Sequence, residues 1–293
     1  MLTRRRFNST VCIALGAMLS GRRAFASPSP SRFVEDLAQF EARSGGRLGV
    51  AVLDTKDGSL IQHRGEERFP MCSTFKLLAA AAVLRSAGDD LAGLKRRVRF
   101  EKSNLVPYSP ETEKHVGGDG MSLAEICEAA ITLSDNTAGN LMLKQIGGPK
   151  GLTAFARSLG DKVTRLDRIE PDLNEAVAGD DRDTTSPNAM ASNMKTLLLG
   201  NALAPAARDQ LTRWLIANKT GDTRLRAGLP PSWRVGDKTG AGRNGTNNDV
   251  AIVWPADRPP LIVTVYLTGS KLEMGEQNEI TASIGRAIAT AFG

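Results

Sequence analysis

The chain contains few residues that could build a metal centre or a disulfide-linked scaffold. Among its 293 residues are three cysteines and two histidines, His63 and His115. Cys12 lies in an N-terminal segment that looks removable, so only Cys72 and Cys127 remain. Zinc sites usually need three or four nitrogen or sulfur ligands, which argues against a dedicated zinc centre. We expect no cofactor.

The chain also lacks the charge excess of a nucleic-acid-binding protein, although its formal net charge is +6. Residues 1–26 hold five of the 38 basic residues and none of the 32 acidic ones, so the rest carries 33 against 32, or +1. A nearly neutral protein has no electrostatic footprint for a polyanion. Neither an internal repeat nor a low-complexity tract is present, and no membrane anchor is expected after residue 26.

The N-terminus has the pattern of an export signal. Arg4, Arg5 and Arg6 precede a short apolar core at residues 11–19, and residues 24–26 offer a small-residue cleavage site. The apolar run is too short for a transmembrane helix. Paired arginines resemble a twin-arginine signal, with a general Sec signal as the alternative. We therefore expect residues 1–26 to be a signal peptide, and residues 27–293 to be a single periplasmic domain of a Gram-negative bacterium.

Hydrophobic periodicity predicts a mixed α+β fold. Strands are expected near both ends of the chain, and helices mainly between them. The expected strands are residues 47–54, 59–63, 233–239, 249–254 and 261–268, and the expected helices are residues 31–43, 73–84, 122–133, 137–146, 151–159, 187–199, 205–217 and 276–291. Strands divided by a long helical insertion indicate an antiparallel sheet built from both chain ends.

The most informative pattern is Ser73-Thr-Phe-Lys76 at the start of an apolar helical stretch. A serine hydroxyl is a weak nucleophile until a neighbouring base takes its proton. Residues three apart on a helix share a face, so the Lys76 amine should lie beside the Ser73 oxygen. Alone, the pattern is common by chance. Cys72 directly precedes Ser73, a position more often packed than bridged; a disulfide to Cys127 is possible, but we favour two buried free thiols.

Three further segments contain residues that could act together with Ser73 and Lys76. They are Ser134-Asp135-Asn136 between two predicted helices, Glu170-Pro-Asp-Leu-Asn174 in a charged loop, and Lys238-Thr239-Gly240 at the end of a predicted strand. Each has an ordinary explanation by itself, such as a helix cap, a solvated glutamate or an exposed strand. Their joint occurrence in this order closely resembles the class A serine β-lactamases. The resemblance covers residues 31–293.

The resemblance implies a β-lactamase/transpeptidase-like fold: a five-stranded antiparallel sheet flanked by helices, plus an all-helical subdomain. The α/β subdomain would comprise residues 27–68 and 219–293, and the helical subdomain residues 69–218. It also implies β-lactam antibiotics as substrates. Nothing suggests more than a monomer.

The resemblance further assigns roles in catalysis. Ser73 would attack the lactam carbonyl, and its backbone N–H and that of Ala241 would bind the oxyanion. Lys76 would be either a neutral base for Ser73 or a charged partner of Glu170. Glu170 would activate the deacylating water. Ser134 would pass a proton to the leaving nitrogen.

Substrate binding is assigned in the same way. Asn174 would hold the deacylating water, and Asn136 would donate to the substrate's side-chain amide. Lys238, Thr239 and Gly240 would lie near the substrate carboxylate, and Tyr108 would line the site. Many relatives place an arginine shortly after the Lys-Thr-Gly strand, where this chain has Thr246-Asn247-Asn248. Arg224 matches the arginine that other relatives use instead.

The loop around Glu170 resembles the family in its scaffold as well. Arg168 and Asp183 match a pair that bridges the loop ends, and Asp167 with Arg182 is expected as a second pair. Relatives have a cis bond at the position of Pro171.

Three segments, residues 71–74, 106–108 and 179–187, resemble the extended-spectrum branch active on oxyimino-cephalosporins, which shares much with chromosomal penicillinases. Ala80 stands where some relatives have a cysteine bridged to the counterpart of Cys127, so that disulfide is not expected here. Gly242 stands where many carbapenem-hydrolysing relatives have a cysteine bridged to the position of Cys72, so carbapenem hydrolysis is less expected.

Two alternatives share part of the motif set. A penicillin-binding D,D-peptidase has the serine, lysine and Lys-Thr-Gly motifs but lacks a deacylating glutamate. A β-lactam sensor domain would bind covalently without turnover, and would need a membrane anchor. Glu170 and Asn174 argue against the first alternative, and the absence of an apolar segment after residue 26 argues against the second.

Overall fold

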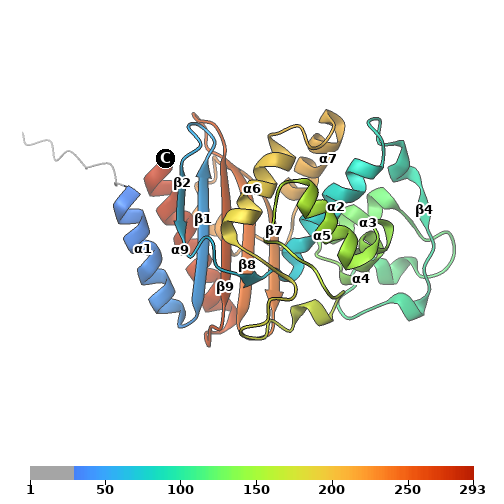
Figure 1. The fold of residues 1–293 in the computed structure, drawn as a ribbon, viewed down its shortest axis with the longest axis horizontal. Coiled ribbons are helices and arrows are strands. Elements are labelled where there is room, and N and C mark those ends of the chain that lie inside the picture. The colour runs from blue at the N-terminus through green and yellow to red at the C-terminus, as the bar shows by residue number, and fades with distance from the viewer. Residues whose placement is uncertain (1–29) are drawn as a thin grey trace, which may run out of the picture.

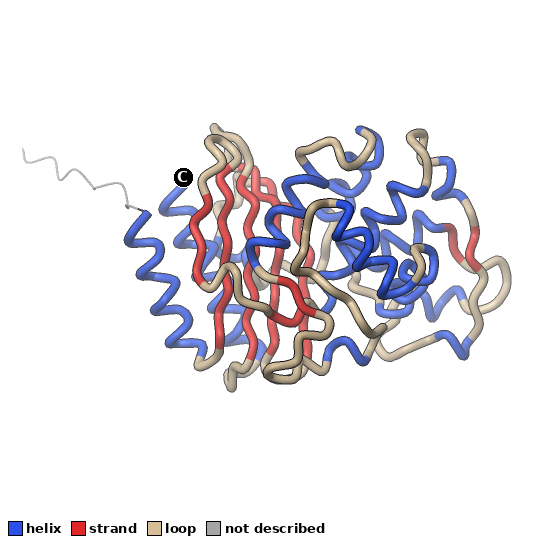
Figure 2. The backbone as a smooth tube through the Cα atoms, in the orientation of Figure 1, coloured by secondary structure: helices blue, strands red, loops and turns tan. Residues whose placement is uncertain are grey.

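A five-stranded antiparallel sheet forms the centre of the molecule in a computed structural model that describes residues 30–293 (Figures 1 and 2). The strand order is β2-β1-β9-β8-β7. Their bounds are β1 Arg47–Asp54, β2 Leu60–His63, β7 Arg234–Gly242, β8 Thr246–Trp254 and β9 Leu261–Thr268. The β1 strand pairs with β9 along its whole length, from Arg47 opposite Thr268 to Asp54 opposite Leu261. The prediction of one sheet built from both chain ends is confirmed.

One face of this sheet is covered by α1 (Pro30–Ser44), α9 (Met274–Phe292) and the short α8 (Leu225–Gly228). In Figure 1, α1 and α9 lie together on the outer side of the strands. Phe33 and Leu37 of α1 pack with Ile280 and Ile284 of α9 in a core cluster that also holds residues of β1, β8 and β9. The apolar stripe predicted for residues 31–43 therefore faces the sheet.

The other face carries α6 (Pro187–Leu198) and adjoins a block of helices on the right of Figure 1. Its members are α2 (Phe75–Ser86), α3 (Leu123–Thr132), α4 (Asn136–Gln145), α5 (Gly148–Ser158) and α7 (Pro205–Ile216). Every residue of α2 from Phe75 to Leu84 is buried. This confirms the prediction of a helix buried on most sides, although α2 begins two residues later than expected, after a 3-10 turn at Cys72–Thr74.

Two pairs of two-residue strands connect loop segments that are distant in the sequence. β3 (Phe69–Pro70) pairs with β6 (Thr184–Thr185), and β4 (Arg97–Val98) pairs with β5 (Met121–Ser122). Such short strands carry no period that a sequence could reveal. The β3–β6 pair brings the segment before Ser73 against the end of residues 165–183, the segment that we call the Glu170 loop.

Cys72 and Cys127 are both buried and unbonded, as expected. None of the helices that the structure describes is both long and apolar enough to cross a membrane. The predicted signal peptide, residues 1–26, lies outside the described residues.

Candidate active site

Ser73 lies in the 3-10 turn Cys72–Thr74, which leads directly into α2. Cys72 has a φ of 45°, a left-handed conformation that is rare for a residue with a side chain and costs about 1–3 kcal/mol. The turn is held against β7 at Gly240, where an added Cβ would lie 2.9 Å from the carbonyl oxygen of Met71. Glycine at this position therefore allows strand β7 to approach the nucleophile.

The Lys76 side chain is fully buried and contacts four oxygen atoms. Its Nζ lies 2.9 Å from Ser73 Oγ, 2.8 Å from the Ser134 carbonyl oxygen and 2.7 Å from Asn136 Oδ1. A fourth contact, 3.0 Å to Glu170 Oε1, is an ion pair. Burial lowers the pKa of Lys76, and the neighbouring Glu170 carboxylate opposes that shift. The predicted proximity of Ser73 and Lys76 is confirmed.

Room for this lysine is made by α4. An added Cβ at Gly139 would lie 2.8 Å from Lys76 Cε, so a larger residue at position 139 would displace the lysine side chain. At the start of the same helix, Asp135 accepts a hydrogen bond from the Ala138 N–H and caps the helix. Asn136 follows that cap, so its position is set by the helix start.

Ser134 and Lys238 form the opposite wall. Ser134 has a φ of 58°, a second left-handed residue in the site. Lys238 is fully buried in β7, and its Nζ donates to Ser134 Oγ at 3.0 Å and to the Thr239 carbonyl oxygen at 2.8 Å. Burial and the positive charge of Lys76 together hold the pKa of Lys238 well below its usual value of 10.5.

Glu170 reaches Ser73 from the Glu170 loop. Its side chain is fully buried, and Ser73 Oγ donates to its Oε1 at 3.3 Å. Asn174 Nδ2 donates to Glu170 Oε2 at 2.5 Å. The Glu170–Pro171 peptide is cis, as the resemblance implied. The motif Glu170 to Asn174 therefore faces the motif Ser73 to Lys76, as the resemblance implied.

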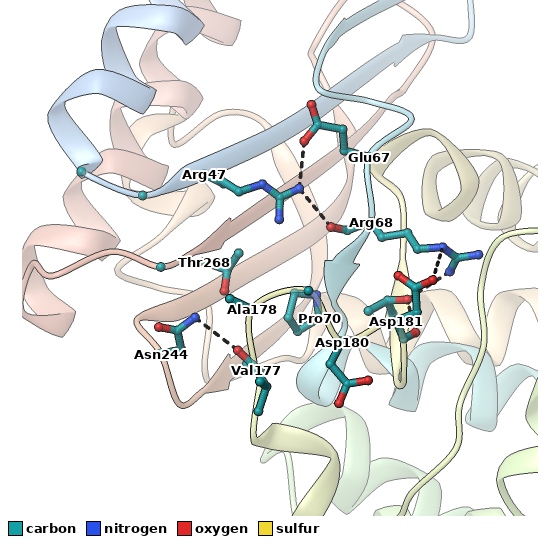
Figure 3. A pocket seen from close by; sticks show the side chains of 16 residues that line it. Arg47, Glu67, Arg68, Pro70, Val177, Ala178, Asp180, Asp181, Asn244 and Thr268 are labelled. Carbon is teal, nitrogen blue, oxygen red and sulfur yellow. Dashed lines mark hydrogen bonds and ion pairs between the residues drawn. The ribbon is translucent and has the colours of Figure 1, made fainter.

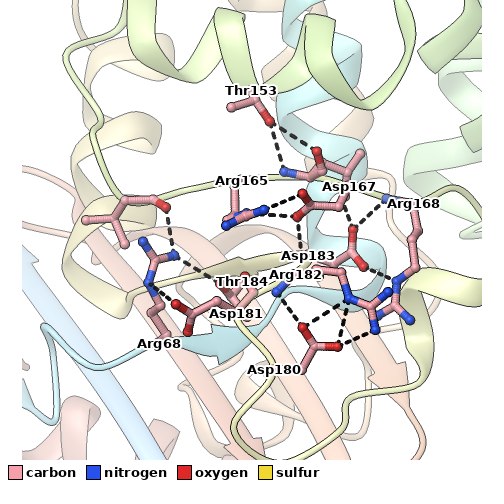
Figure 4. A network of polar contacts seen from close by, with 12 residues as sticks. Arg68, Thr153, Arg165, Asp167, Arg168, Asp180, Asp181, Arg182, Asp183 and Thr184 are labelled. Atoms are coloured by element: carbon pink, nitrogen blue, oxygen red, sulfur yellow. Dashed lines mark hydrogen bonds and ion pairs between the residues drawn. The ribbon is translucent and has the colours of Figure 1, made fainter.

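The ends of the Glu170 loop are joined by buried charges (Figure 4). Arg168 Nε donates to Asp183 Oδ2 at 2.6 Å, which confirms the expected pair. The second expected pair, Asp167 with Arg182, is wrong. Asp167 instead pairs with Arg165 at 2.6 Å, and Arg182 pairs with Asp180 at 2.7 Å. In both cases the partner is only two residues away, so local pairing prevails over pairing across the loop.

Beyond Lys238, Thr239 and Gly240 are buried, and Ala241 is exposed near the end of β7. Arg224 is 7% exposed, and its Nη1 donates to the carbonyl oxygens of Gly240 and Asn248 at 2.9 and 2.6 Å. Burial lowers the pKa of Arg224. The structure thus brings Arg224 against the Lys-Thr-Gly strand, although it approaches from the side of α8.

Tyr108 lies at the rim, with 61% of its surface exposed. Its φ of 64° makes it a third left-handed residue near the site, and its carbonyl oxygen accepts from the Asn136 N–H at 2.9 Å. A hollow of about 290 Å³ beside the site is lined by residues that include Pro171, Asn174 and Gly242. All twelve predicted site residues thus belong to one neighbourhood around Ser73.

A larger hollow of about 680 Å³ lies under the outer part of the Glu170 loop (Figure 3). Its wall carries Arg47, Glu67 and Arg68, but neither Ser73 nor Glu170. Arg47 donates to Glu67 at 2.8 Å, so these two charges satisfy each other. The size of this hollow does not make it the active site, because it holds no nucleophile near a base.

Sequence reasoning missed two supporting groups. Asn140 donates to the Glu170 carbonyl oxygen and accepts from the Glu170 N–H, both at 2.9 Å. It lies four residues after Asn136 on α4, and that spacing on one helix face was an available signal. Asp237 on β7 and Asp249 on β8 are both buried, and burial together with Asp237 raises the pKa of Asp249; alternation in a strand alone gave no hint of this pairing.

Comparison with known proteins agrees with this geometry. Residues 32–292 match the model of the β-lactamase enzyme family. The chain is 48% identical to β-lactamase Toho-1 of Escherichia coli, covering 98% of each chain, and 50% identical to β-lactamase OXY-1 of Klebsiella oxytoca, covering 87% of each. The solved structure of an ancestral (GNCA) class A β-lactamase aligns with a TM-score of 0.87 at 62% identity, covering 89% of this chain and 100% of that one. The chain therefore belongs to the β-lactamase enzyme family, and within it to class A.

Proposed function

We propose that this protein hydrolyses the lactam amide of penicillins and cephalosporins through an acyl-enzyme on Ser73. The observation that carries the proposal is the position of Ser73 Oγ, 2.9 Å from Lys76 Nζ and 3.3 Å from Glu170 Oε1. A serine so placed has both a cation to stabilise its alkoxide and a carboxylate to accept its proton. As a class A β-lactamase, the chain is a hydrolase.

The contacts of Lys76 support the ammonium form in the free enzyme. Asn136 Nδ2 faces the Pro107 carbonyl oxygen at 2.9 Å, and because that oxygen can only accept, Asn136 Oδ1 must be the atom that faces Lys76. The Ser134 carbonyl and the Glu170 carboxylate are also acceptors. With Glu170 ionised, three acceptors require three protons, and a neutral amine carries two. Glu170 is therefore the base that we assign to Ser73.

In acylation, Glu170 takes the Ser73 proton as Oγ bonds to the lactam carbonyl carbon. The C–N bond then breaks, and Ser134 gives its proton to the nitrogen. Ser134 Oγ accepts from Lys238, so its own proton is free to point toward the substrate. Lys76, which contacts both Glu170 and Ser134, gives a proton to Ser134 and takes the proton held by Glu170, so Lys76 is again an ammonium and Glu170 again a carboxylate. The backbone N–H groups of Ser73 and Ala241 hold the oxyanion, and losing one such donor typically costs about 10²–10³ in kcat.

Deacylation requires a water activated by Glu170, and Asn174 supplies its second anchor. Asn174 donates to Glu170 Oε2, and its buried Oδ1 has no protein partner within residues 30–293. That free acceptor beside a carboxylate fits a water that donates to both. Water attack on the acyl carbon releases the ring-opened acid and restores Ser73. A penicillin-binding peptidase lacks this pair.

The substrate carboxylate fits the positive end of the site. Lys238 supplies the charge, Thr239 a hydroxyl and Arg224 a second cation, while Gly240 keeps the strand edge open. Asn136 has one amide N–H beyond its bond to Pro107 for the substrate's side-chain amide. The exposed Tyr108 ring forms the rim. The resemblance of residues 71–74, 106–108 and 179–187 to the extended-spectrum branch supports including oxyimino-cephalosporins among the cephalosporins that we propose as substrates.

We also propose that the protein acts in the periplasm as a monomer. The support is the basic, then apolar, then small-residue pattern of residues 1–26. We treat residues 27–293 as one domain. Its α/β part, residues 27–68 and 219–293, supplies the whole five-stranded sheet, and its helical part, residues 69–218, supplies Ser73, Ser134 and Glu170.

The experiment is nitrocefin hydrolysis by the purified protein, with Ser73→Ala and Glu170→Ala beside it. We expect turnover by the unmutated protein and none by Ser73→Ala. In Glu170→Ala, which keeps Lys76 beside Ser73, we expect a covalent adduct that forms slowly and is not released, detectable by mass spectrometry. A stable adduct without turnover in the unmutated protein would overturn the proposal in favour of a sensor or a peptidase.

A further inference from the structure

Thr239 hydrogen-bonds to a residue outside the known motifs. Thr220 lies in the turn that follows α7, and its Oγ1 is 2.5 Å from Thr239 Oγ1. Thr220 Oγ1 also lies 2.9 Å from Asn218 Oδ1, and the Thr220 N–H donates to the same oxygen at 3.1 Å. Asn218 Nδ2 in turn donates to Asp237 Oδ2 at 2.6 Å. These four side chains form one continuous line of hydrogen bonds from Asp237 to the substrate side of β7.

The direction of each hydrogen bond in this line can be assigned. A backbone N–H can only donate, so the Asn218 atom that faces Thr220 is the amide oxygen. That oxygen cannot donate, so in its contact with Thr220 Oγ1 the threonine hydroxyl is the donor. A hydroxyl carries a single proton. The proton in the contact between Thr220 and Thr239 must therefore come from Thr239.

The Thr239 proton consequently points away from the place assigned to the substrate carboxylate. For Thr239 to donate to that carboxylate, its proton must leave Thr220. Thr220 can then turn its own proton from Asn218 to Thr239, since Asn218 Oδ1 keeps the Thr220 N–H as a donor. Both threonine hydroxyls rotate together, and no heavy atom needs to move.

The backbone of the turn that carries Thr220 is held in place. Thr220 therefore cannot move away from Thr239, and the two hydroxyls must rotate when the substrate carboxylate binds. An added Cβ at Gly221 would lie 1.9 Å from Asp237 Oδ2, which shows how closely the turn packs on that carboxylate. The Lys219 N–H donates to the Thr132 carbonyl oxygen at 3.0 Å. Arg226 Nε holds Asp237 from the other side at 2.6 Å.

We propose that Thr220 is a specificity-determining positioning residue: it competes with the substrate carboxylate for the proton of Thr239. This inference rests on the proposed function, because it needs the carboxylate to bind at Thr239. Substrates that carry the carboxylate must displace Thr220 as acceptor, whereas a substrate with an esterified carboxylate need not. A net hydrogen bond of this kind corresponds to about a two- to tenfold change in affinity.

The test uses Thr220→Val, which keeps the shape and removes the hydroxyl. In a Ser73→Ala background, calorimetry measures non-covalent binding of benzylpenicillin and of its methyl ester. We expect Thr220→Val to tighten benzylpenicillin binding about two- to tenfold and to leave the ester unchanged. Thr220→Ser, which retains the hydroxyl, should restore the original affinity. With Ser73 present, kcat/KM should rise for benzylpenicillin while kcat changes less than about twofold.

Unchanged or weakened benzylpenicillin binding in Thr220→Val would overturn the proposal, as would an equal change for acid and ester. Thermal unfolding of each variant identifies a folding defect, and a loss of affinity in both Thr220→Val and Thr220→Ser at an unchanged melting temperature would also count against it. No nitrocefin turnover by the unmutated protein would instead overturn the proposed function. Turnover without a Thr220 effect would leave that function intact and reject only the role of Thr220.

Discussion

Asn140 holds the backbone of Glu170 at both of its polar atoms. Its Nδ2 donates to the Glu170 carbonyl oxygen and its Oδ1 accepts from the Glu170 N–H, each at 2.9 Å. Asn140 belongs to α4, the same helix that supplies Asn136 to Lys76. The helix α4 thus positions both Glu170, the catalytic base, and Lys76, the cation beside Ser73. Acylation and deacylation therefore depend on the same helix.

Replacing Asn140 with alanine should slow both steps that use Glu170, and deacylation more than acylation, because Lys76 remains beside Ser73 in acylation whereas the deacylating water has only Glu170 and Asn174. Loss of both hydrogen bonds frees the Glu170 backbone, and a displacement of about 1 Å can reduce a rate about 10²-fold. We expect acyl-enzyme to accumulate in Asn140→Ala, with kcat lowered by about 10–10². Rapid-quench mass spectrometry with benzylpenicillin measures the accumulation. Asn188→Ala, at an asparagine on α6 far from Ser73 in the chain, is the control. An equal decrease of kcat in both variants would show that the two hydrogen bonds of Asn140 do not position Glu170.

The alkaline limit of activity should depend on Lys238. Burial and Lys76 hold the pKa of Lys238 well below 10.5, so as pH rises its ammonium is lost earlier than that of an exposed lysine. The neutral amine would no longer attract the substrate carboxylate, so kcat/KM should fall on the alkaline side below pH 10.5. Lys238→Arg keeps its proton throughout this range. Its alkaline limb should shift to higher pH, whatever its absolute rate, and an unshifted limb would assign the titration to another group.

Much of this molecule could be predicted from the sequence, because its signals were strong and local. The sheet and the eight long helices of residues 30–293 follow from periodicity, and the contact of Ser73 with Lys76 follows from their spacing. The meeting of this pair with Ser134, Glu170 and Lys238 follows from the resemblance to class A β-lactamases. Boundaries were less certain where the backbone departs from a regular helix. The turn before α2 is the example: the strained Cys72 allows Ser73 to precede the helix, and no residue type marks that strain.

What could not be predicted depends on contacts between distant segments. Asp167 could pair with Arg165 or with Arg182. The free energies of these two surface ion pairs differ little, since each is typically below about 1 kcal/mol. The chain from Asp237 through Asn218 and Thr220 to Thr239 joins a turn to a strand with no shared motif. Such networks are set by tertiary packing, which single-sequence patterns do not record.

The buried pair Asp237 and Asp249 should carry one negative charge between them. Asp249 Oδ1 is buried without a hydrogen-bond partner among residues 30–293 when both carboxyls are counted as acceptors. Burial and Asp237 hold the pKa of Asp249 well above 3.8, so the neutral acid supplies the missing donor. Because the folded state binds this proton and the unfolded state releases it above pH 3.8, Asp249 should reduce stability as pH rises through that window.

Asp249→Asn should consequently change the free energy of unfolding by less than about 1 kcal/mol near pH 7, because it replaces one neutral group with another. Asp237→Asn removes the charged partner of Arg226 and should cost about 3–5 kcal/mol. Denaturant unfolding at pH 5 and pH 8 measures both variants. Asp249→Asn should also flatten the pH dependence seen in the parent protein. A loss in Asp249→Asn as large as in Asp237→Asn would show that both carboxyls are ionised.

The Glu170 loop offers a matched pair of arginines that differ in burial. Arg168 donates to Asp183, whose side chain is almost fully buried and also accepts from the N–H groups of Asp167 and Arg168 (Figure 4). Arg182 pairs with Asp180 at the surface. Removing Arg168 leaves a buried carboxylate without its cation, which should cost about 3–5 kcal/mol. Removing Arg182 should cost less than about 1 kcal/mol.

Thermal unfolding of Arg168→Ala and Arg182→Ala tests this difference. A domain of this size loses about 2–4 °C in Tm for each kcal/mol, so Arg168→Ala should melt at least several degrees below Arg182→Ala. Because the same loop carries Glu170, Arg168→Ala should also accumulate acyl-enzyme with benzylpenicillin, and Arg182→Ala should not. If the two variants melt together, the loop is held by its backbone contacts and the β3–β6 pair rather than by the Arg168–Asp183 ion pair. Normal deacylation in a destabilised Arg168→Ala would show that Glu170 is positioned by Asn140 alone.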